Sequence, residues 1–213
     1  MLDLSKLTAR QNELRSKIKI LKFDKELKIL AGCDSALILD KNQIISVFVI
    51  FSYPDLEILD IVKEVSELTM PYISGFLAFR EIPNILKAYE KLKHEPDLIM
   101  VDGHGIAHPR RMGIASHLGV LIEKPTIGVG KSKLYGKFDM PCPEKGCFSE
   151  LNNKDELLGY ALRSKDYVKP IFVSPGNLID AKSALEITIS TLRKHKLPEP
   201  TRLADFYSKK LKT

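Results

Sequence analysis

Apolar and polar positions recur along this chain with two spacings, one typical of amphipathic helices and one of buried strands. From about Glu81, for example, Ile82, Ile85 and Leu86 share one face of a predicted helix that has Pro83 in its first turn. The pattern predicts further helices at residues 5–29, 56–68, 111–122, 180–195 and 200–211. It predicts strands at residues 27–33, 36–39, 44–51, 97–101, 126–129, 159–162 and 170–174.

The order of these elements predicts the fold class. Asp40-Lys41-Asn42 is a polar turn of the kind that joins two strands of a hairpin, so the chain begins with an antiparallel meander. Strands and helices then alternate, which indicates an α/β protein with a mixed sheet and helices on its faces. No repeat or flexible linker divides the 213 residues, and 44% of them are hydrophobic. We therefore expect one domain, 1–213, with a sizeable core.

The segment Asp102-Gly103-His104-Gly105 follows the apolar run 97–101 directly. A carboxylate at the end of a strand buried on both faces is poorly solvated, and a metal ion beside it offsets that cost. The glycines allow a sharp turn and the close approach of a ligand. We therefore interpret the segment as an active-site corner. His104 itself, inside the tight turn, is expected to bind backbone and not to be catalytic.

Three carboxylates stand at separated places along the chain. Asp34 follows the first strand, Glu81 opens a helix, and Asp102 ends the strand at 97–101. Because ligands collect beyond the carboxyl ends of strands, these side chains can converge on a divalent cation. Oxygen ligands alone favour Mg²⁺ or Mn²⁺. The alternative is that each acid is only a helix cap or a surface charge.

Charge and cysteine content limit the class of protein further. The net charge is +6, and the basic residues crowd the last third of the chain, which favours a polyanionic partner. Lysine-rich helices that are merely solvated are the alternative. No apolar run approaches a membrane span, and the N-terminus lacks a signal-peptide core, so we expect a cytoplasmic protein without a membrane partner. Cys142 and Cys147 are expected to be loop thiols and not zinc ligands.

Six segments of the chain resemble the endonuclease V family, and they occur in the family's order. The string Asp102–Arg110 is specific, whereas Gly128–Lys131 alone is weak. The matching segments are Ala31–Asp34, Pro71–Gly75, Phe79–Glu81, Asp102–Arg110, Gly128–Lys131 and Val173–Gly176. The resemblance implies a ribonuclease-H-like fold: a mixed β-sheet flanked by helices.

The resemblance also implies an activity. Members of this family are metal-dependent endonucleases that recognise deoxyinosine, the product of adenine deamination, in DNA. They cleave the second phosphodiester bond 3′ to the lesion and leave 3′-hydroxyl and 5′-phosphate ends, as a step of DNA repair. The expected cofactor is Mg²⁺, for which Mn²⁺ can substitute. The expected partner is inosine-containing DNA, or RNA as an alternative, and the protein is expected to be a monomer.

The resemblance also implies a role for each residue that matches a functional position of the family. Asp34, Glu81 and Asp102 match the acidic metal ligands, with Glu81 close by or acting through water. His108 and Lys131 match positions near the scissile phosphate, where a cation or donor stabilises developing charge. All five are expected to be catalytic.

Further positions are expected to bind the substrate. Tyr72 matches an aromatic wedge that enters the duplex beside the extruded base, and Ile73 follows it. Gly75 and Gly105 would lend backbone groups to a pocket for hypoxanthine, which presents a 6-oxo acceptor and an N1 donor. Arg110 adds charge that suits phosphate.

Some positions depart from the family pattern or leave alternatives open. Ser74 stands where many members have proline, and Asn177 stands where histidine is common, so a role for a charged histidine there is in doubt. Asp205 matches a C-terminal position that approaches the metals and receives little weight from sequence. Two other functions remain alternatives: hydrolysis of a small phosphorylated substrate by the same acids, and nucleic-acid binding by the basic C-terminal part of the chain without catalysis.

Overall fold

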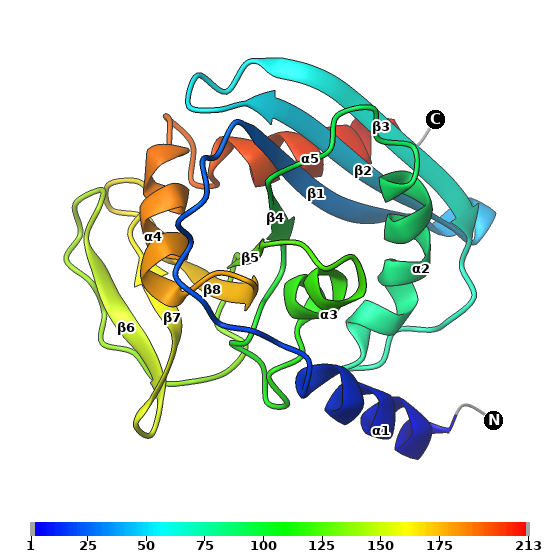
Figure 1. Cartoon of the computed structure of the whole chain (residues 1–213), viewed down its shortest axis with the longest axis horizontal. Helices are drawn as coiled ribbons and strands as arrows, with labels where there is room; N and C mark the ends of the chain where they lie inside the picture. Colours follow the sequence, from blue (N-terminus) through cyan, green and yellow to red (C-terminus); the bar gives the residue numbers. More distant parts are fainter. Residues whose placement is uncertain (1–2, 212–213) are drawn as a thin grey trace.

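A computed structural model describes residues 3–211, and its centre is an eight-stranded mixed sheet with the order β3-β2-β1-β4-β5-β8-β7-β6 (Figure 1). The strands are β1 (Ile29–Ile38), β2 (Gln43–Ser52), β3 (Ile58–Glu67), β4 (Leu98–Asp102), β5 (Thr126–Gly130), β6 (Phe148–Asn153), β7 (Glu156–Leu162) and β8 (Ile171–Asn177). The helices are α1 (Leu4–Arg15), α2 (Leu77–Tyr89), α3 (Ile114–Leu121), α4 (Ala181–Ser190) and α5 (Glu199–Lys210), with a 3₁₀ turn, η1, at Leu39–Lys41. The α/β class and the opening meander are confirmed.

Three central strands run parallel and bring their carboxyl ends to one edge of the sheet. β4 pairs in parallel with β1 and with β5, whereas all other neighbours pair antiparallel. The last β1–β4 pair is Cys33 with Val101, and Asp102 lies opposite Val129 on β5. Residues just beyond these pairs therefore share one place in space.

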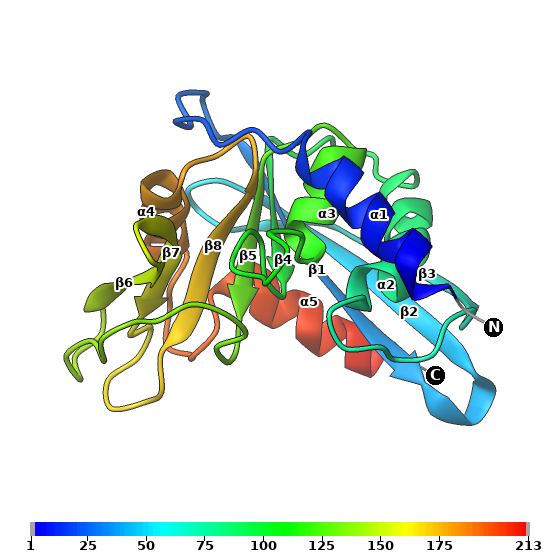
Figure 2. The same cartoon turned by 90° about the horizontal axis from the view of Figure 1, so that it is seen from below.

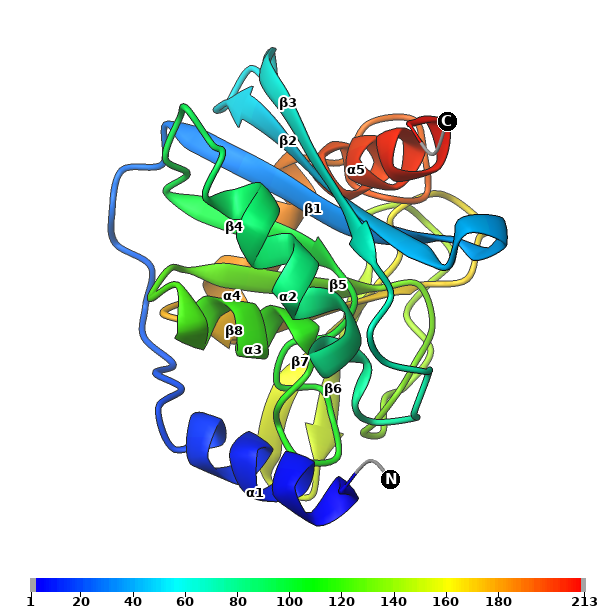
Figure 3. The same cartoon turned by 90° about the vertical axis from the view of Figure 1, so that its right-hand side faces the viewer.

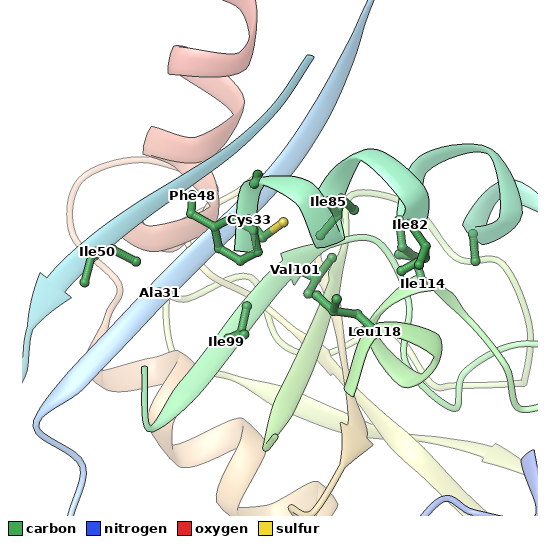
Figure 4. Close-up of a cluster of buried hydrophobic side chains, with 13 residues drawn as sticks. Ala31, Cys33, Phe48, Ile50, Ile82, Ile85, Ile99, Val101, Ile114 and Leu118 are labelled. Atoms are coloured by element: carbon green, nitrogen blue, oxygen red, sulfur yellow. The ribbon is translucent and has the colours of Figure 1, made fainter. Parts of the chain in front are cut away.

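Helices cover both faces of the sheet (Figures 2 and 3). α2 and α3 pack on one face, where Ala31 and Cys33 of β1 meet Ile82 and Ile85 of α2 in a buried cluster (Figure 4). α5 lies on the opposite face, against Val47 and its neighbours on β2. Because side chains alternate along a strand, the residues of β1 next to Ala31 and Cys33 point toward α5.

Gly32 allows the close approach of α5 to β1. A Cβ atom at this position would lie 2.0 Å from the carbonyl oxygen of Pro200, in the first turn of α5. No residue with a side chain can occupy this position without moving the helix or the strand. The glycine therefore decides how near α5 comes to the neighbouring Asp34.

Two helix predictions were wrong. The helix predicted over 5–29 ends at Arg15, and beyond it the backbone of Lys19 bonds to Asn177 Oδ1 and to Leu178 N–H. The helix predicted over 56–68 is the strand β3, whose branched residues, such as Ile61, extend the meander beside β2. In both places contacts with distant segments outweigh local helical preference.

Smaller corrections concern element boundaries. The strands predicted at 27–33 and 36–39 are one strand, β1, and α2 begins at Leu77, so Pro83 lies beyond its first turn. The polar edge strand β6 was missed. Asn42 closes the predicted hairpin in the left-handed conformation, with φ of 50°.

Two further predictions concerned the state of the cysteines and the presence of a membrane span. Cys142 and Cys147 are paired in a disulfide in the loop before β6, where we expected free thiols, and Cys33 is buried.

Among the helices of residues 3–211, none combines the length and the apolar character that crossing a bilayer requires.

Candidate active site

Three aspartates from distant parts of the chain meet at the edge where the parallel strands end. Carboxylate oxygens of Asp34, Asp102 and Asp205 all lie within 4.8 Å of one another. Asp34 follows the last β1–β4 pair and Asp102 is the final residue of β4, so these two are neighbours across the sheet. Asp205 comes from α5 on the covering face. The predicted convergence of Asp34 and Asp102 is confirmed.

Asp205, which received little weight from the sequence, is a full member of this cluster. It lies one helical turn before Ser208, whose hydroxyl donates to Asp34 Oδ2 at 2.7 Å and to the Asp205 carbonyl at 2.9 Å. Its match to a C-terminal position of the family was one signal, and its spacing of three residues from Ser208, on one face of a basic helix, was a second. That signal became informative only when β1 was known to lie beneath α5.

Two lysines compensate the negative charge of the cluster. Lys131, directly after β5, places Nζ 2.5 Å from Asp102 Oδ2 and 2.6 Å from Asp205 Oδ1. Lys209 lies 2.7 Å from Asp205 Oδ2. Lys131 thus stands beside the carboxylates.

Burial and mutual repulsion perturb the titration of these groups. Burial, followed by the charge of Asp102, raises the pKa of Asp34 to about 7, and burial also raises the pKa of Asp102. Burial would lower the pKa of Lys131, but Asp102 and Asp205 raise it overall. Burial opposes the lowering of the Asp205 pKa, which hydrogen bonds from Lys131 and Lys209 nevertheless bring about. The site is therefore short of positive charge when all of its carboxylates are ionised.

Glu81 lies near this cluster but outside the group of three aspartates. It projects from the middle of α2, on the face of the sheet opposite α5. Burial, and next the charge of Asp34, raise the pKa of Glu81 to about 8. The sequence correctly located Glu81 near Asp34, whereas the third member of the tight group is Asp205.

The cluster has the chemistry of a divalent-cation site. Its donors are carboxylate oxygens alone, which suits Mg²⁺ or Mn²⁺. The ammonium of Lys131 already bridges two of the three aspartates, so a cation is favourable there. The residues present therefore fit a divalent metal ion held by Asp34, Asp102 and Asp205.

A cavity of about 300 Å³ opens beside this edge of the sheet. Tyr72, Gly75 and His108 line it, together with Lys133 from the segment that follows Lys131. The Tyr72 side chain is 65% exposed. The cavity is of a size that admits a flat heterocycle, with an aromatic ring at its rim.

His108 enters this cavity as a neutral ring. It is 4% exposed, and burial, then the charge of Arg110, lower its pKa to about 4. Its Nδ1 accepts the Arg110 backbone N–H at 3.1 Å, so the proton is on Nε2. At neutral pH His108 is therefore a hydrogen-bond donor and not a cation.

The loop that carries Tyr72 is held by two side chains at Gly75. The Gly75 carbonyl accepts from Arg110 Nη2 at 2.7 Å and from Gln11 Nε2 at 3.0 Å. Arg110 Nε also donates to Gln11 Oε1, and the guanidinium stacks 4.4 Å from the centre of the Phe76 ring. Arg110, which we expected to bind phosphate, thus makes internal contacts. Gln11, on α1, was not identified from the sequence.

Other predicted residues lie deeper in the structure. Gly105 is buried, with its N–H donating to Ser174 Oγ at 2.8 Å and its carbonyl accepting from Gly113, so both backbone groups have partners within the chain. Ile73 is half-buried in the loop of Tyr72 and does not line the cavity. His104 places Nε2 3.0 Å from the Ser132 carbonyl oxygen, which is the backbone contact that was expected.

Asn177 has a structural role far from the carboxylates. Its Oδ1 accepts the Lys19 N–H at 3.0 Å, and its Nδ2 donates to the Gly119 carbonyl at 2.9 Å. It ties the segment after α1 to α3. The departure from histidine at this position therefore concerns packing.

Comparison with known proteins adds independent information. A sequence model of the family described as Endonuclease V matches residues 12–206. Endonuclease V of Petrotoga mobilis is 47% identical over 202 residues, which cover 95% of this chain and 90% of that protein.

Solved structures agree with this match. The crystal structure of Endonuclease V from Bacillus subtilis has a TM-score of 0.93 and 34% identity, covering 99% of this chain and 92% of that one. Endonuclease V of Ciona intestinalis, in complex with DNA containing an inosine followed by a ribo-adenosine, has a TM-score of 0.85 and 31% identity. That match covers 98% of this chain and 97% of the other.

Proposed function

We propose that this chain, which belongs to the endonuclease V family and is a nuclease, cleaves DNA that contains deoxyinosine in a reaction that requires Mg²⁺ or Mn²⁺. One observation carries the proposal: a cluster of three carboxylates lies at the edge of the sheet beside a cavity with an aromatic rim. The first feature suits a phosphodiester and the second suits an extruded base. We propose cleavage at the second phosphodiester bond 3′ to the inosine, which leaves 3′-hydroxyl and 5′-phosphate ends. The biological role that we propose for this cut is a step of DNA repair.

The carboxylates are the groups that would bind the metal ion. Asp34, Asp102 and Asp205 would hold the cation, and Glu81 would act nearby or through water. The chemistry that the bound cation supplies is stabilisation of charge on the phosphate and acidification of the attacking water. Ser208 orients Asp34 through its hydroxyl, which keeps one carboxylate oxygen directed into the site.

Lys131 and His108 act on the substrate. Lys131, whose ammonium contacts both Asp102 and Asp205, would donate to a non-bridging phosphate oxygen of a substrate bound beside them. For His108, a neutral hydrogen-bond donor at physiological pH, we propose the role that its match to the family implies, which is donation to the scissile phosphate as charge develops there.

Tyr72 and Gly75 would select the damaged base. The exposed ring of Tyr72 would stack on the neighbour of the extruded nucleotide and offset part of the unstacking cost. Gly75 keeps the loop close to the cavity, with Arg110 and Gln11 behind it.

Cleavage of a duplex with a single inosine, with and without Mg²⁺, tests the proposal. We expect Asp102→Ala to abolish cleavage while binding persists, because the substitution removes a negative charge that repels DNA. Loss of binding together with cleavage would contradict this assignment. An inosine duplex left uncut in the presence of Mg²⁺ or Mn²⁺ would contradict the function itself.

The choice between DNA and RNA needs a competition experiment. The Ciona protein was crystallised with DNA in which a ribonucleotide follows the inosine. We propose DNA as the substrate of this chain, with inosine-containing RNA as the alternative. Equimolar deoxyinosine and riboinosine strands, labelled separately, decide between them by their relative kcat/KM. Monomeric state and cytoplasmic location remain predictions.

A further inference from the structure

A second hollow, of about 610 Å³, lies between α5 and the loop that precedes it. Three lysines, one arginine and one histidine line it, together with one carboxylate. These residues are Lys196, Lys209, Lys210, Arg202, His195 and Asp205. Arg202 is paired with Glu199 at 2.5 Å and Lys209 with Asp205, whereas no carboxylate of residues 3–211 lies within 4.0 Å of the ammonium of Lys196 or Lys210. The hollow therefore presents uncompensated positive charge.

An aromatic ring stands among these cations. Phe206 lines the hollow and is 46% exposed, although it is large and apolar. The Lys210 ammonium lies 5.5 Å from the centre of its ring. An exposed ring flanked by unpaired lysines is the arrangement that binds a nucleic-acid strand, with the ring stacking on a base and the lysines contacting phosphates.

The hollow is continuous with the candidate active site. Asp205 belongs both to it and to the cluster of three carboxylates. Lys196 donates to the Lys131 carbonyl at 3.5 Å, and the residues that follow, 132–134, line the base cavity. The segment 131–134 therefore lines the base cavity at residues 132–134, and its first residue, Lys131, contacts both the carboxylates and Lys196 of the hollow.

We propose that this hollow binds the DNA strand on the 3′ side of the scissile phosphate, with a base stacked on Phe206 and phosphates held by Lys196 and Lys210. The inference rests on the proposed function, because a cut 3′ to the inosine orders the strand: the base cavity, then the carboxylates, then α5. The stacked base is unpaired, so the strand separates from its complement downstream of the cut.

Truncated substrates test this placement. The cut strand is shortened from its 3′ end until a single nucleotide remains beyond the scissile phosphate, and in a parallel series it is shortened from its 5′ end. For the wild-type protein we expect kcat/KM to fall about tenfold across the 3′ series, the usual value of one stacked base with its phosphate. Cleavage of inosine over adenine in the longest substrate verifies the underlying function separately.

Two variants should remove the effect of length. Phe206→Leu keeps an apolar side chain but not the stacking surface, and should lower kcat/KM about tenfold on long 3′ arms and leave it unchanged on the shortest. Lys196→Gln with Lys210→Gln should reduce the slope of log affinity against log salt by about 0.7 for each phosphate that is no longer neutralised. Preference for inosine over adenine should persist in both.

Matched controls are available elsewhere on the surface. Phe148→Ala removes an aromatic side chain that is 52% exposed on β6, and Lys169→Gln with Lys182→Gln removes two exposed lysines. Neither should change the 3′ length dependence, and thermal unfolding checks that each variant is folded. The proposal is overturned if the wild-type protein cleaves inosine strands equally well at every 3′ length. It is also overturned if Phe206→Leu retains the wild-type length dependence, or if its defect appears only when a complementary strand is present.

Discussion

Gln11 offers a sharp test of how the loop beside the base cavity is held in place, because it bonds to that loop and not to the carboxylates. Its side chain is fully buried and bonds in both directions, donating to the Gly75 carbonyl and accepting from Arg110 Nε. Gln11→Ala removes both bonds and leaves the Arg110 donor without this partner. The Gly75 carbonyl keeps its bond from Arg110 Nη2, so the loop is loosened and not released.

The magnitude follows from these contacts. An unpaired buried donor costs about 1–3 kcal/mol, and a protein of this size loses about 2–4 °C in Tm for each kcal/mol. If the same cost falls on the loop that forms the cavity, the affinity for an inosine strand falls about five- to 150-fold. Because Gln11 does not touch the carboxylates, kcat at saturating substrate should stay unchanged.

Binding titrations and thermal unfolding measure the two effects. Gln11→Glu keeps the acceptor for Arg110 and loses the donor to Gly75, so it should fall between wild type and Gln11→Ala in affinity. Asn12→Ala, at the exposed neighbouring position, is the control. Wild-type affinity in Gln11→Ala, or a lower kcat with unchanged Kd, would refute the reasoning.

Three further predictions follow from single contacts. Tyr72→Ala should change stability by less than about 0.5 kcal/mol, because the ring is exposed, yet lower the ratio of kcat/KM for inosine over adenine strands; equal losses on both strands would exclude a wedge. The pKa values of Asp34 and Glu81, raised to about 7 and about 8, mean that the folded metal-free protein holds protons that the unfolded chain releases. Their contribution to stability is fully present below about pH 4, where the unfolded chain is protonated as well, and it is lost progressively as pH rises to the folded-state values of about 7 and about 8. Tm in chelator should therefore fall between about pH 4 and pH 8, and Mg²⁺ should restore it most at the alkaline end; a Tm in chelator that rises over this window would contradict the shifts. Gly32→Ala would place a Cβ 2.0 Å from the Pro200 carbonyl oxygen, and it should lower the free energy of unfolding by about 1–3 kcal/mol and remove most of the cleavage activity. Denaturant unfolding and cleavage assays measure the two losses, and wild-type behaviour in both would show that α5 is free to move.

Local patterns predicted the parts of this fold that depend on near neighbours. The run 97–101 became β4 and the turn at Asn42 became a hairpin, because a fully apolar strand and a polar turn carry their own signals. The segments 16–28 and 58–67 were misassigned because their partners, the loop after β8 and the strand β2, are far away in the sequence. An edge strand such as β3 shows only weak alternation, which a helical pattern can imitate.

The sequence by itself determined the α/β class, the family and the carboxylates Asp34 and Asp102, since these depend on residue types at short spacing. Only the tertiary structure decided that Asp205 completes their cluster, that His108 is neutral and that Gln11 holds the cavity loop. The physical reason is common to all three. Proximity across the sheet, burial and a shared hydrogen-bond acceptor are properties of how distant segments pack, and no spacing along the chain encodes them.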